Sequence, residues 1–131
     1  MLFDKIIMAS FEEDMPNGDI TTVATVPENA VAVGFFKAKA DGVICGTDIA
    51  KRSFELAGGG VDISFNVKDG DFVKKGDIIA KVNGNARTIL MGERTALNLM
   101  QRASGIATAT RTACEAVKGT STRITDTRKT M

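Results

Sequence analysis

VDISFNVKDGDFVKKGDIIAKVNG, residues 61–84, decides the fold of this chain. β-Branched and aromatic residues form short runs here, and Gly70-Asp71 and Gly76-Asp77 interrupt them six residues apart. Such runs between turn residues are typical of strands, and the short spacing predicts a tight antiparallel meander. From residue 87 to residue 117 apolar side chains instead recur at three- and four-residue steps, which predicts one long helix. Short strands followed by a long helix indicate an α+β fold.

The flanking segments supply further expected elements. Their patterns predict a helix over residues 2–14, strands over 30–39 and 43–45, a helix over 48–57 and a strand over 122–127. Thr47 or Asp48 is suited to cap the 48–57 helix, and Gly58-Gly59-Gly60 to end it. In the long helix, Ser104-Gly105 marks either a kink or a point of close packing.

The composition excludes several classes of protein. The chain has 131 residues and 13.9 kDa, with 44% apolar and 25% charged residues, which is ordinary for one globular domain. No apolar run reaches membrane-spanning length and the acidic start is unlike a signal peptide, so we expect a cytoplasmic protein without a membrane anchor. The lack of histidine excludes a Ser-His-Asp triad, an imidazole base and a His-ligated metal. Cys45 and Cys114 form no CxxC pair and are expected to be reduced.

The charge is unevenly distributed along the chain. Residues 1–86 carry 9 Lys and Arg against 13 Asp and Glu (9 − 13 = −4), and residues 87–131 carry 8 against 3 (8 − 3 = +5). A basic last third favours an anionic partner, although a solvated helix face accounts for many such runs. Because the chain has no Trp or Tyr and all its Phe precede residue 73, a base-stacking nucleic-acid surface is disfavoured. We expect small anions such as carboxylates or phosphates, and neither nucleic acid nor membrane.

Residues 67–84, VKDGDFVKKGDIIAKVNG, resemble half of the hammerhead of biotinyl and lipoyl carrier domains. The carriers hold their target lysine in a Met-Lys-Met-like hairpin, which this sequence lacks. Lys74 and Lys75 are therefore interpreted as solvated lysines at a strand edge. The resemblance supports the fold more than a carrier function.

Three further blocks together resemble the quinolinate phosphoribosyltransferase family. They are Glu13-Asp14 with Gly18-Asp19-Ile20-Thr21-Thr22, then GERTALNLMQRASGIAT over residues 92–108, and ITDTRKT over residues 124–130. The resemblance implies an N-terminal α/β sandwich like a hammerhead or barrel-sandwich over residues 1–103. It implies that residues 104–131 are the first helix and strand of a truncated α/β barrel. A relative of the same fold found with molybdenum-transport proteins stays open as an alternative, as does a non-catalytic carrier or binding module.

The implied activity is transfer of a phosphoribosyl group from phosphoribosyl pyrophosphate to the nitrogen of quinolinate. Nicotinate mononucleotide, pyrophosphate and carbon dioxide are the products, within de novo NAD biosynthesis. Magnesium would be held mainly by the pyrophosphate of the donor, with no metal site in this segment. The resemblance leaves the catalytic residues unknown, because most belong to the barrel after residue 131, and it implies that this segment alone is inactive.

The resemblance also assigns substrate-binding residues. Arg94 matches an arginine that reaches the dicarboxylate from a neighbouring subunit, and Thr127, Arg128 and Lys129 match a stretch that lines the quinolinate pocket. Arginine forks bind such oxygens in bidentate fashion. Taken alone, Arg94 could instead pair with Glu93 or Glu115 on the helix surface, and Arg128-Lys129 could be only a basic chain end.

Helix length independently favours a dimer. Residues 94–118 span about 36 Å as a straight helix at ~1.5 Å per residue. A returning strand over residues 119–128 recovers at most roughly 30 Å. Arg94 and Arg128 of one chain are therefore not expected to meet, and we expect a homodimer that joins Arg94 of one subunit with Arg128-Lys129 of the other.

Overall fold

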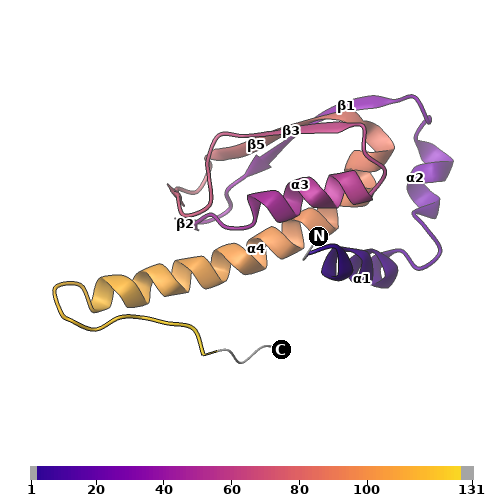
Figure 1. Cartoon of the computed structure of the whole chain (residues 1–131). Helices are drawn as coiled ribbons and strands as arrows, with labels where there is room; N and C mark the ends of the chain where they lie inside the picture. The colour runs from indigo at the N-terminus through magenta and orange to yellow at the C-terminus, as the bar shows by residue number, and fades with distance from the viewer. Residues whose placement is uncertain (1–2, 128–131) are drawn as a thin grey trace.

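The computed structural model describes residues 3–127, which form two layers. In chain order the elements are α1 (Asp4–Asp14), α2 (Ile20–Thr25), β1 (Val31–Lys37), β2 (Gly42–Val43), α3 (Thr47–Leu56), β3 (Val61–Phe65), β4 (Phe72–Val73), β5 (Ile78–Asn85) and α4 (Ala86–Ala116). Helices α3 and α4 lie against one face of a sheet made of β1, β5 and β3, and α1 and α2 flank them (Figure 1). The predicted α+β class is confirmed.

The core lies between the sheet and the two central helices. The sheet is antiparallel with the order β1-β5-β3, and its register pairs Phe36 with Ala80 and Ile63 with Val82. Phe36 and Val82 are buried on the inner face, where the Phe36 ring lies 6.2 Å from the ring of Phe54 on α3. Burial of these side chains supplies the apolar driving force that joins the two layers.

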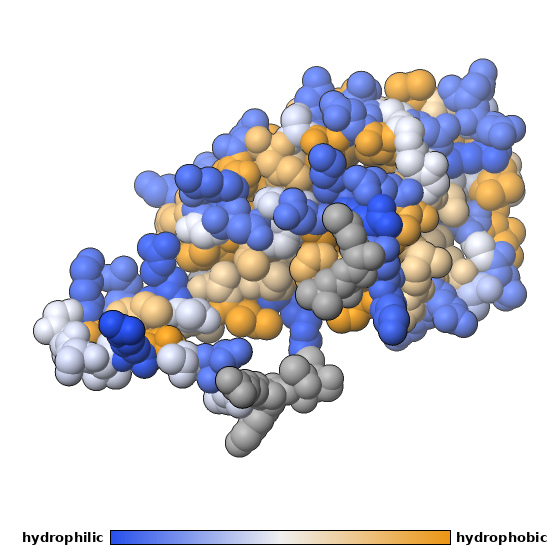
Figure 2. All heavy atoms as spheres, viewed as in Figure 1, coloured by the Kyte–Doolittle hydropathy of each residue, from blue (hydrophilic) through white to orange (hydrophobic). Residues whose placement is uncertain are grey.

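Among the described residues, no helix covers the outer face of the sheet (Figure 1). Val31, Val33 and Phe35 alternate along β1 and remain 73%, 54% and 61% exposed. Apolar spheres accordingly lie among polar ones on the surface of the molecule in Figure 2. The helices between residues 3 and 127 include none that is long and apolar enough to cross a membrane.

The predicted meander is wrong, because β4 pairs with β2 and not with its neighbours in sequence. The two Gly-Asp turns are similar in detail: Lys68 N donates to the Asp71 carboxylate at 3.0 Å, and Lys74 N to that of Asp77 at 2.9 Å. Gly70 and Gly76 adopt positive φ angles of 95° and 102°, which favour glycine. The first turn bonds to Ile44 after β2, and in the second turn Lys75 N donates to the carboxylate of Asp41 before β2, so the short strand between the turns is carried onto β2.

The cap of α3 also differs from the prediction. The N-cap residue is Gly46, and the carboxylate of Asp69 accepts hydrogen bonds from Gly46 N at 2.9 Å and Thr47 N at 3.0 Å. Burial raises the pKa of Asp69, but the bonds from Gly46 and Thr47 together lower it below its usual value. A loop distant in sequence therefore stabilises the start of α3, in place of Thr47 or Asp48.

Helix α4 continues without a break through Ser104-Gly105. Ser104 packs closely as one of the two alternatives predicted, but Gly105 does not, because a Cβ atom there would meet no atom within 4 Å. The Ser104 hydroxyl accepts from Cys45 N at 3.0 Å and donates to the Cys45 carbonyl at 3.1 Å. Thr108 similarly accepts from Val43 N at 2.9 Å. Two side chains of α4 thus satisfy backbone groups beside the short strand β2.

The strand predicted over residues 122–127 does not form. A strand needs a neighbouring strand for its hydrogen bonds. In the described part of the chain, all strand pairing occurs within the β1-β5-β3 and β2-β4 sheets. The segment instead turns back beneath α4 (Figure 1).

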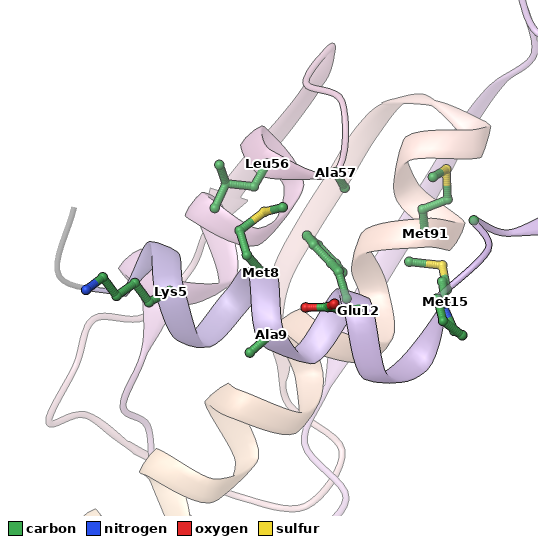
Figure 3. Close-up of a pocket in the computed structure, with 11 residues that line it drawn as sticks. Lys5, Met8, Ala9, Glu12, Met15, Leu56, Ala57 and Met91 are labelled. Carbon is green, nitrogen blue, oxygen red and sulfur yellow. The ribbon is translucent and has the colours of Figure 1, made fainter.

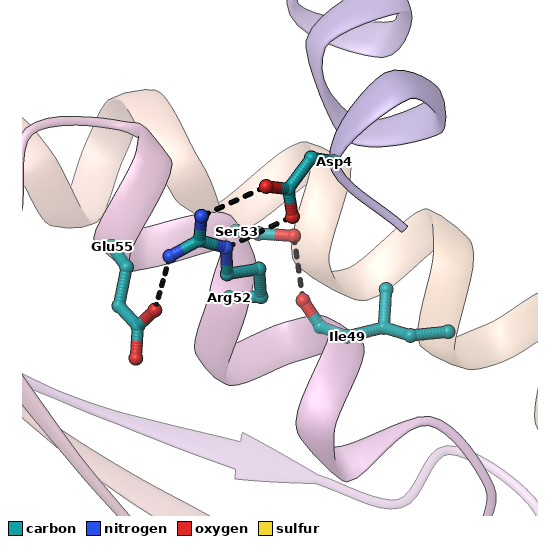
Figure 4. A network of polar contacts seen from close by, with 5 residues as sticks. All are labelled: Asp4, Ile49, Arg52, Ser53 and Glu55. Atoms are coloured by element: carbon teal, nitrogen blue, oxygen red, sulfur yellow. Dashed lines mark hydrogen bonds and ion pairs between the residues drawn. The ribbon is translucent and has the colours of Figure 1, made fainter. Parts of the chain in front are cut away.

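An ion-pair network fastens α1 to α3. The Arg52 guanidinium donates to both carboxylate oxygens of Asp4, at 3.0 and 2.9 Å, and to Glu55 at 2.8 Å (Figure 4). The bond to Arg52 holds the pKa of Asp4 well below its usual range. Ile7 of α1 is fully buried, so both polar and apolar contacts hold this helix against the core.

Candidate functional site

The site is built around the connection between α1 and α2. Asp14 ends α1, and Asp19 caps α2 by accepting a hydrogen bond from Thr22 N at 2.9 Å. Two hydrogen bonds from Thr22 lower the pKa of Asp19, and the bond from the side chain has a larger effect than the bond from the backbone. Helix α2 is absent from the elements predicted above, although Asp19 three residues before Thr22 is the pattern of an N-cap.

Arg87 ties α2 to the start of α4. Its guanidinium donates to the carbonyl oxygens of Val26 at 2.8 Å and Val23 at 3.1 Å. These bonds place a positive charge at the C-terminal end of α2, where unpaired carbonyls and the helix dipole favour a cation. Sequence alone had left Arg87 without a role.

Arg94 lies two helical turns further along the same helix and contacts α1. Its Nη1 lies 2.5 Å from Oδ1 of Asp14, and its side chain is 69% exposed against 25% for Asp14. Arg94 thus pairs with Asp14 and with neither Glu93 nor Glu115, the two alternatives on the helix surface. Long-range folding brings together the first and the second of the three sequence blocks.

A hollow of about 340 Å³ surrounds this ion pair. Its lining includes three carboxylates, from Asp14, Asp19 and Glu93, and one guanidinium, from Arg94. The excess of negative charge disfavours an anion inside the hollow. An anion can therefore meet Arg94 only at the edge of the guanidinium that faces solvent.

A second hollow of about 680 Å³ adjoins the first, sharing Met15 and Gly18 with it. Figure 3 shows Met8, Met15 and Met91 around it, with Leu56 on the α3 side. Its charged lining residues are Lys5 and Glu12. It lacks the converging donors that a dicarboxylate needs.

The remaining predicted residues lie beyond α4. Thr127 is exposed, and Arg128 and Lys129 lie outside the described residues. The residues from Arg94 to Ala116 form one helix that spans about 33 Å at ~1.5 Å per residue. The grouping of Arg94, Thr127, Arg128 and Lys129 in one substrate site stays a prediction.

Residues 3–127 contain no group of three or more Asp, Glu or Cys side chains placed to hold a metal ion. The carboxylates around Arg94 are engaged differently, since Asp14 accepts from Arg94 and Asp19 from Thr22. The expectation that magnesium enters with the pyrophosphate of the donor stays a prediction.

Comparison with known proteins decides the family. Residues 19–104 match the family model described as quinolinate phosphoribosyl transferase, N-terminal domain. The chain belongs to the quinolinate phosphoribosyltransferase family. The match contains the α2 cap, Arg87 and Arg94, and it ends within the unbroken helix α4. The division into domains at residues 103 and 104 stays a prediction.

Two curated members of the family are similar over nearly the whole chain. The nicotinate-nucleotide pyrophosphorylase (carboxylating) of Mycobacterium leprae is 41% identical over 128 residues, covering 95% of this chain and 45% of the relative. The chloroplastic one of Arabidopsis thaliana is 40% identical over 125 residues, covering 95% and 35%. The chain thus spans less than half the length of these relatives.

Solved structures agree with the fold. NadC from Streptococcus pyogenes superimposes with a TM-score of 0.93 at 33% identity, covering 99% of this chain and 46% of that one. The nicotinate-nucleotide pyrophosphorylase from Francisella tularensis gives a TM-score of 0.79 at 29% identity, covering 88% and 41%. The two-layer arrangement is therefore that of the N-terminal portion of this family.

Proposed function

We propose that this chain is the N-terminal part of a quinolinate phosphoribosyltransferase. The complete enzyme joins the nitrogen of quinolinate to the ribose carbon of phosphoribosyl pyrophosphate and releases pyrophosphate and carbon dioxide. Nicotinate mononucleotide is the product. The observation that carries the proposal is the family match over residues 19–104, which contains Arg94 with its largely exposed side chain.

The role proposed for Arg94 is to bind a carboxylate of quinolinate. A guanidinium presents several N–H donors in a plane and binds a carboxylate in bidentate fashion. Because carboxylates line the hollow behind Arg94, the anion approaches from the solvent side. Further positive charge must then come from another surface that faces Arg94.

We assign that surface to Thr127, Arg128 and Lys129 of a second subunit. The unbroken helix after Arg94 supports this assignment, because it carries the chain about 33 Å away before it can return. A homodimer with two shared sites satisfies both the helix length and the need for positive charge. Magnesium enters as an ion carried by the pyrophosphate of the donor.

Mixed dimers test this proposal. In the complete enzyme that contains this chain, Arg94→Ala and Arg128→Ala homodimers should each be nearly inactive, because every site lacks one arginine. After subunit exchange, each heterodimer has one intact site and one doubly damaged site. About half the dimers are then heterodimers, so about a quarter of wild-type activity should return.

One control and three contrary outcomes separate this result from its alternatives. Mixing Arg111→Ala, which removes an exposed arginine of the same helix, with wild type should change little. If mass spectrometry proves subunit exchange and no activity returns, the shared site is contradicted, but the proposed activity of the wild-type enzyme is not. A wild-type enzyme that makes no nicotinate mononucleotide from quinolinate would contradict the activity itself, and a biotinyl or lipoyl adduct on Lys74 or Lys75 would favour a carrier.

A further inference from the structure

Asp14 contacts Arg94, the proposed substrate-binding arginine. It is 80 positions away from Arg94 in sequence, yet its carboxylate accepts a hydrogen bond of 2.5 Å from the guanidinium. The Asp14 side chain is only 25% exposed, whereas that of Arg94 is 69% exposed. The Asp14 side chain is therefore the more enclosed member of the pair, and the Arg94 side chain is the more exposed one.

The segment that carries Asp14 is held at both ends. On one side, α1 is anchored by the bond between Asp4 and Arg52 and by the fully buried Ile7. On the other side, Arg87 binds the end of α2 through two carbonyl oxygens. The Asp14 carboxylate is thus attached to packed structure and presents a fixed acceptor to α4.

A fixed acceptor matters because a free arginine side chain samples many rotamers. Binding a ligand with such a side chain costs the entropy of ordering it, and a side chain already held in its bound orientation avoids that cost. The bond to Asp14 uses Nη1, and a guanidinium has five N–H donors in one plane. One edge can therefore contact Asp14 while another remains directed outward.

We propose that Asp14 is a positioning residue for quinolinate binding, which acts by orienting the Arg94 guanidinium toward the dicarboxylate. This inference rests on the proposed function. Asp14 does not contact the substrate in this proposal, and its negative charge would repel it. Its contribution comes only through Arg94, so removal of the carboxylate should weaken quinolinate binding and leave the chemical step unchanged.

The test compares variants of the complete enzyme that contains this chain. Asp14→Asn should raise KM for quinolinate about two- to fivefold, the range that an exposed ion pair supports. The turnover number and KM for phosphoribosyl pyrophosphate should stay at the wild-type values. Asp14→Glu, which keeps the carboxylate, should recover part of the affinity. Glu13→Gln removes the same charge from the adjacent exposed position and should have no effect.

A double-mutant cycle identifies the route of the effect. In an Arg94→Ala background, Asp14→Asn should leave kcat/KM for quinolinate unchanged, because the residue through which it acts is already absent. Urea unfolding of each variant provides a second readout that does not depend on activity. The expected midpoints of Asp14→Asn and Glu13→Gln are similar.

Several results would overturn the inference. A wild-type KM for quinolinate in Asp14→Asn shows that Asp14 does not contribute to binding. An equal loss of kcat/KM from Asp14→Asn in the wild-type and Arg94→Ala backgrounds shows that Asp14 does not act through Arg94. Loss of turnover and of stability together shows a structural role. In these cases the wild-type enzyme still converts quinolinate, so the proposed function stands. If wild type does not convert quinolinate, the proposed function fails and this inference fails with it.

Discussion

Replacing Asp69 with alanine should destabilise the chain much more than replacing Asp48. Asp69 accepts from Gly46 N at 2.9 Å and from Thr47 N at 3.0 Å, and so pairs two donors at the start of α3. Each such bond contributes about 0.5–1.5 kcal/mol net, and loss of a helix cap costs about 0.5–2 kcal/mol. We therefore expect the free energy of unfolding to fall by about 2 kcal/mol at pH 7.

Asp48 is the matched control, since it is an exposed carboxylate in the first turn of the same helix. It interacts there with the helix dipole, which is worth about 0.5 kcal/mol. Urea unfolding followed by circular dichroism at 222 nm measures both variants. With a urea m-value of about 2 kcal/mol/M, Asp69→Ala should lower the midpoint by about 1 M, and Asp48→Ala by about 0.25 M.

Acid should reduce the contribution of Asp69. Its pKa is lower in the folded chain than its ordinary value of about 4, so the folded state favours the charged form. The stabilisation is complete above pH 4 and is lost as the pH falls through the folded pKa. The difference in stability between wild type and Asp69→Asn should therefore shrink in acid. Equal midpoints for wild type and Asp69→Ala, or a larger loss for Asp48→Ala, would refute the assignment of the cap.

Three other predictions test separate parts of the fold. Gly84→Ala should lower the free energy of unfolding by about 3 kcal/mol or more, because the new Cβ atom would overlap a backbone carbonyl. Gly76→Ala, with open space around it, should lower it by about 1 kcal/mol, and equal losses of the two variants in urea unfolding would contradict this difference. The exposed Cys114 thiol should react with a chromogenic disulfide at pH 8 about tenfold faster than the Cys45 thiol, because burial raises the pKa of Cys45. A single reaction phase for both thiols would contradict this difference. Ser104→Ala leaves Cys45 N without its acceptor and should cost about 1–2 kcal/mol, so an unchanged urea midpoint would show that this contact is dispensable.

The sequence alone determined the local elements of this protein. Helices α1, α3 and α4 and strand β1 lie within a few residues of their predicted ranges, and β3 and β5 begin within the stretch 61–84 that predicts short strands. Apolar periodicity and glycine turns act over a few residues, so they can be recognised without knowing the partners of a segment. Three short blocks similarly pointed to the family, because each is continuous in sequence.

Tertiary structure decided which segments meet. The partner of β4, the cap of α3 by Asp69 and the pairing of Arg94 with Asp14 all join residues distant in sequence. Many carboxylates in the chain have the same local chemistry. Only the path of the folded backbone decides which of them caps α3 and which of them pairs with Arg94. The segment 122–127 shows the converse, since its β-branched residues favour a strand but no strand among residues 3–127 pairs with it. Local preference thus specifies an element only where folding also brings it a partner.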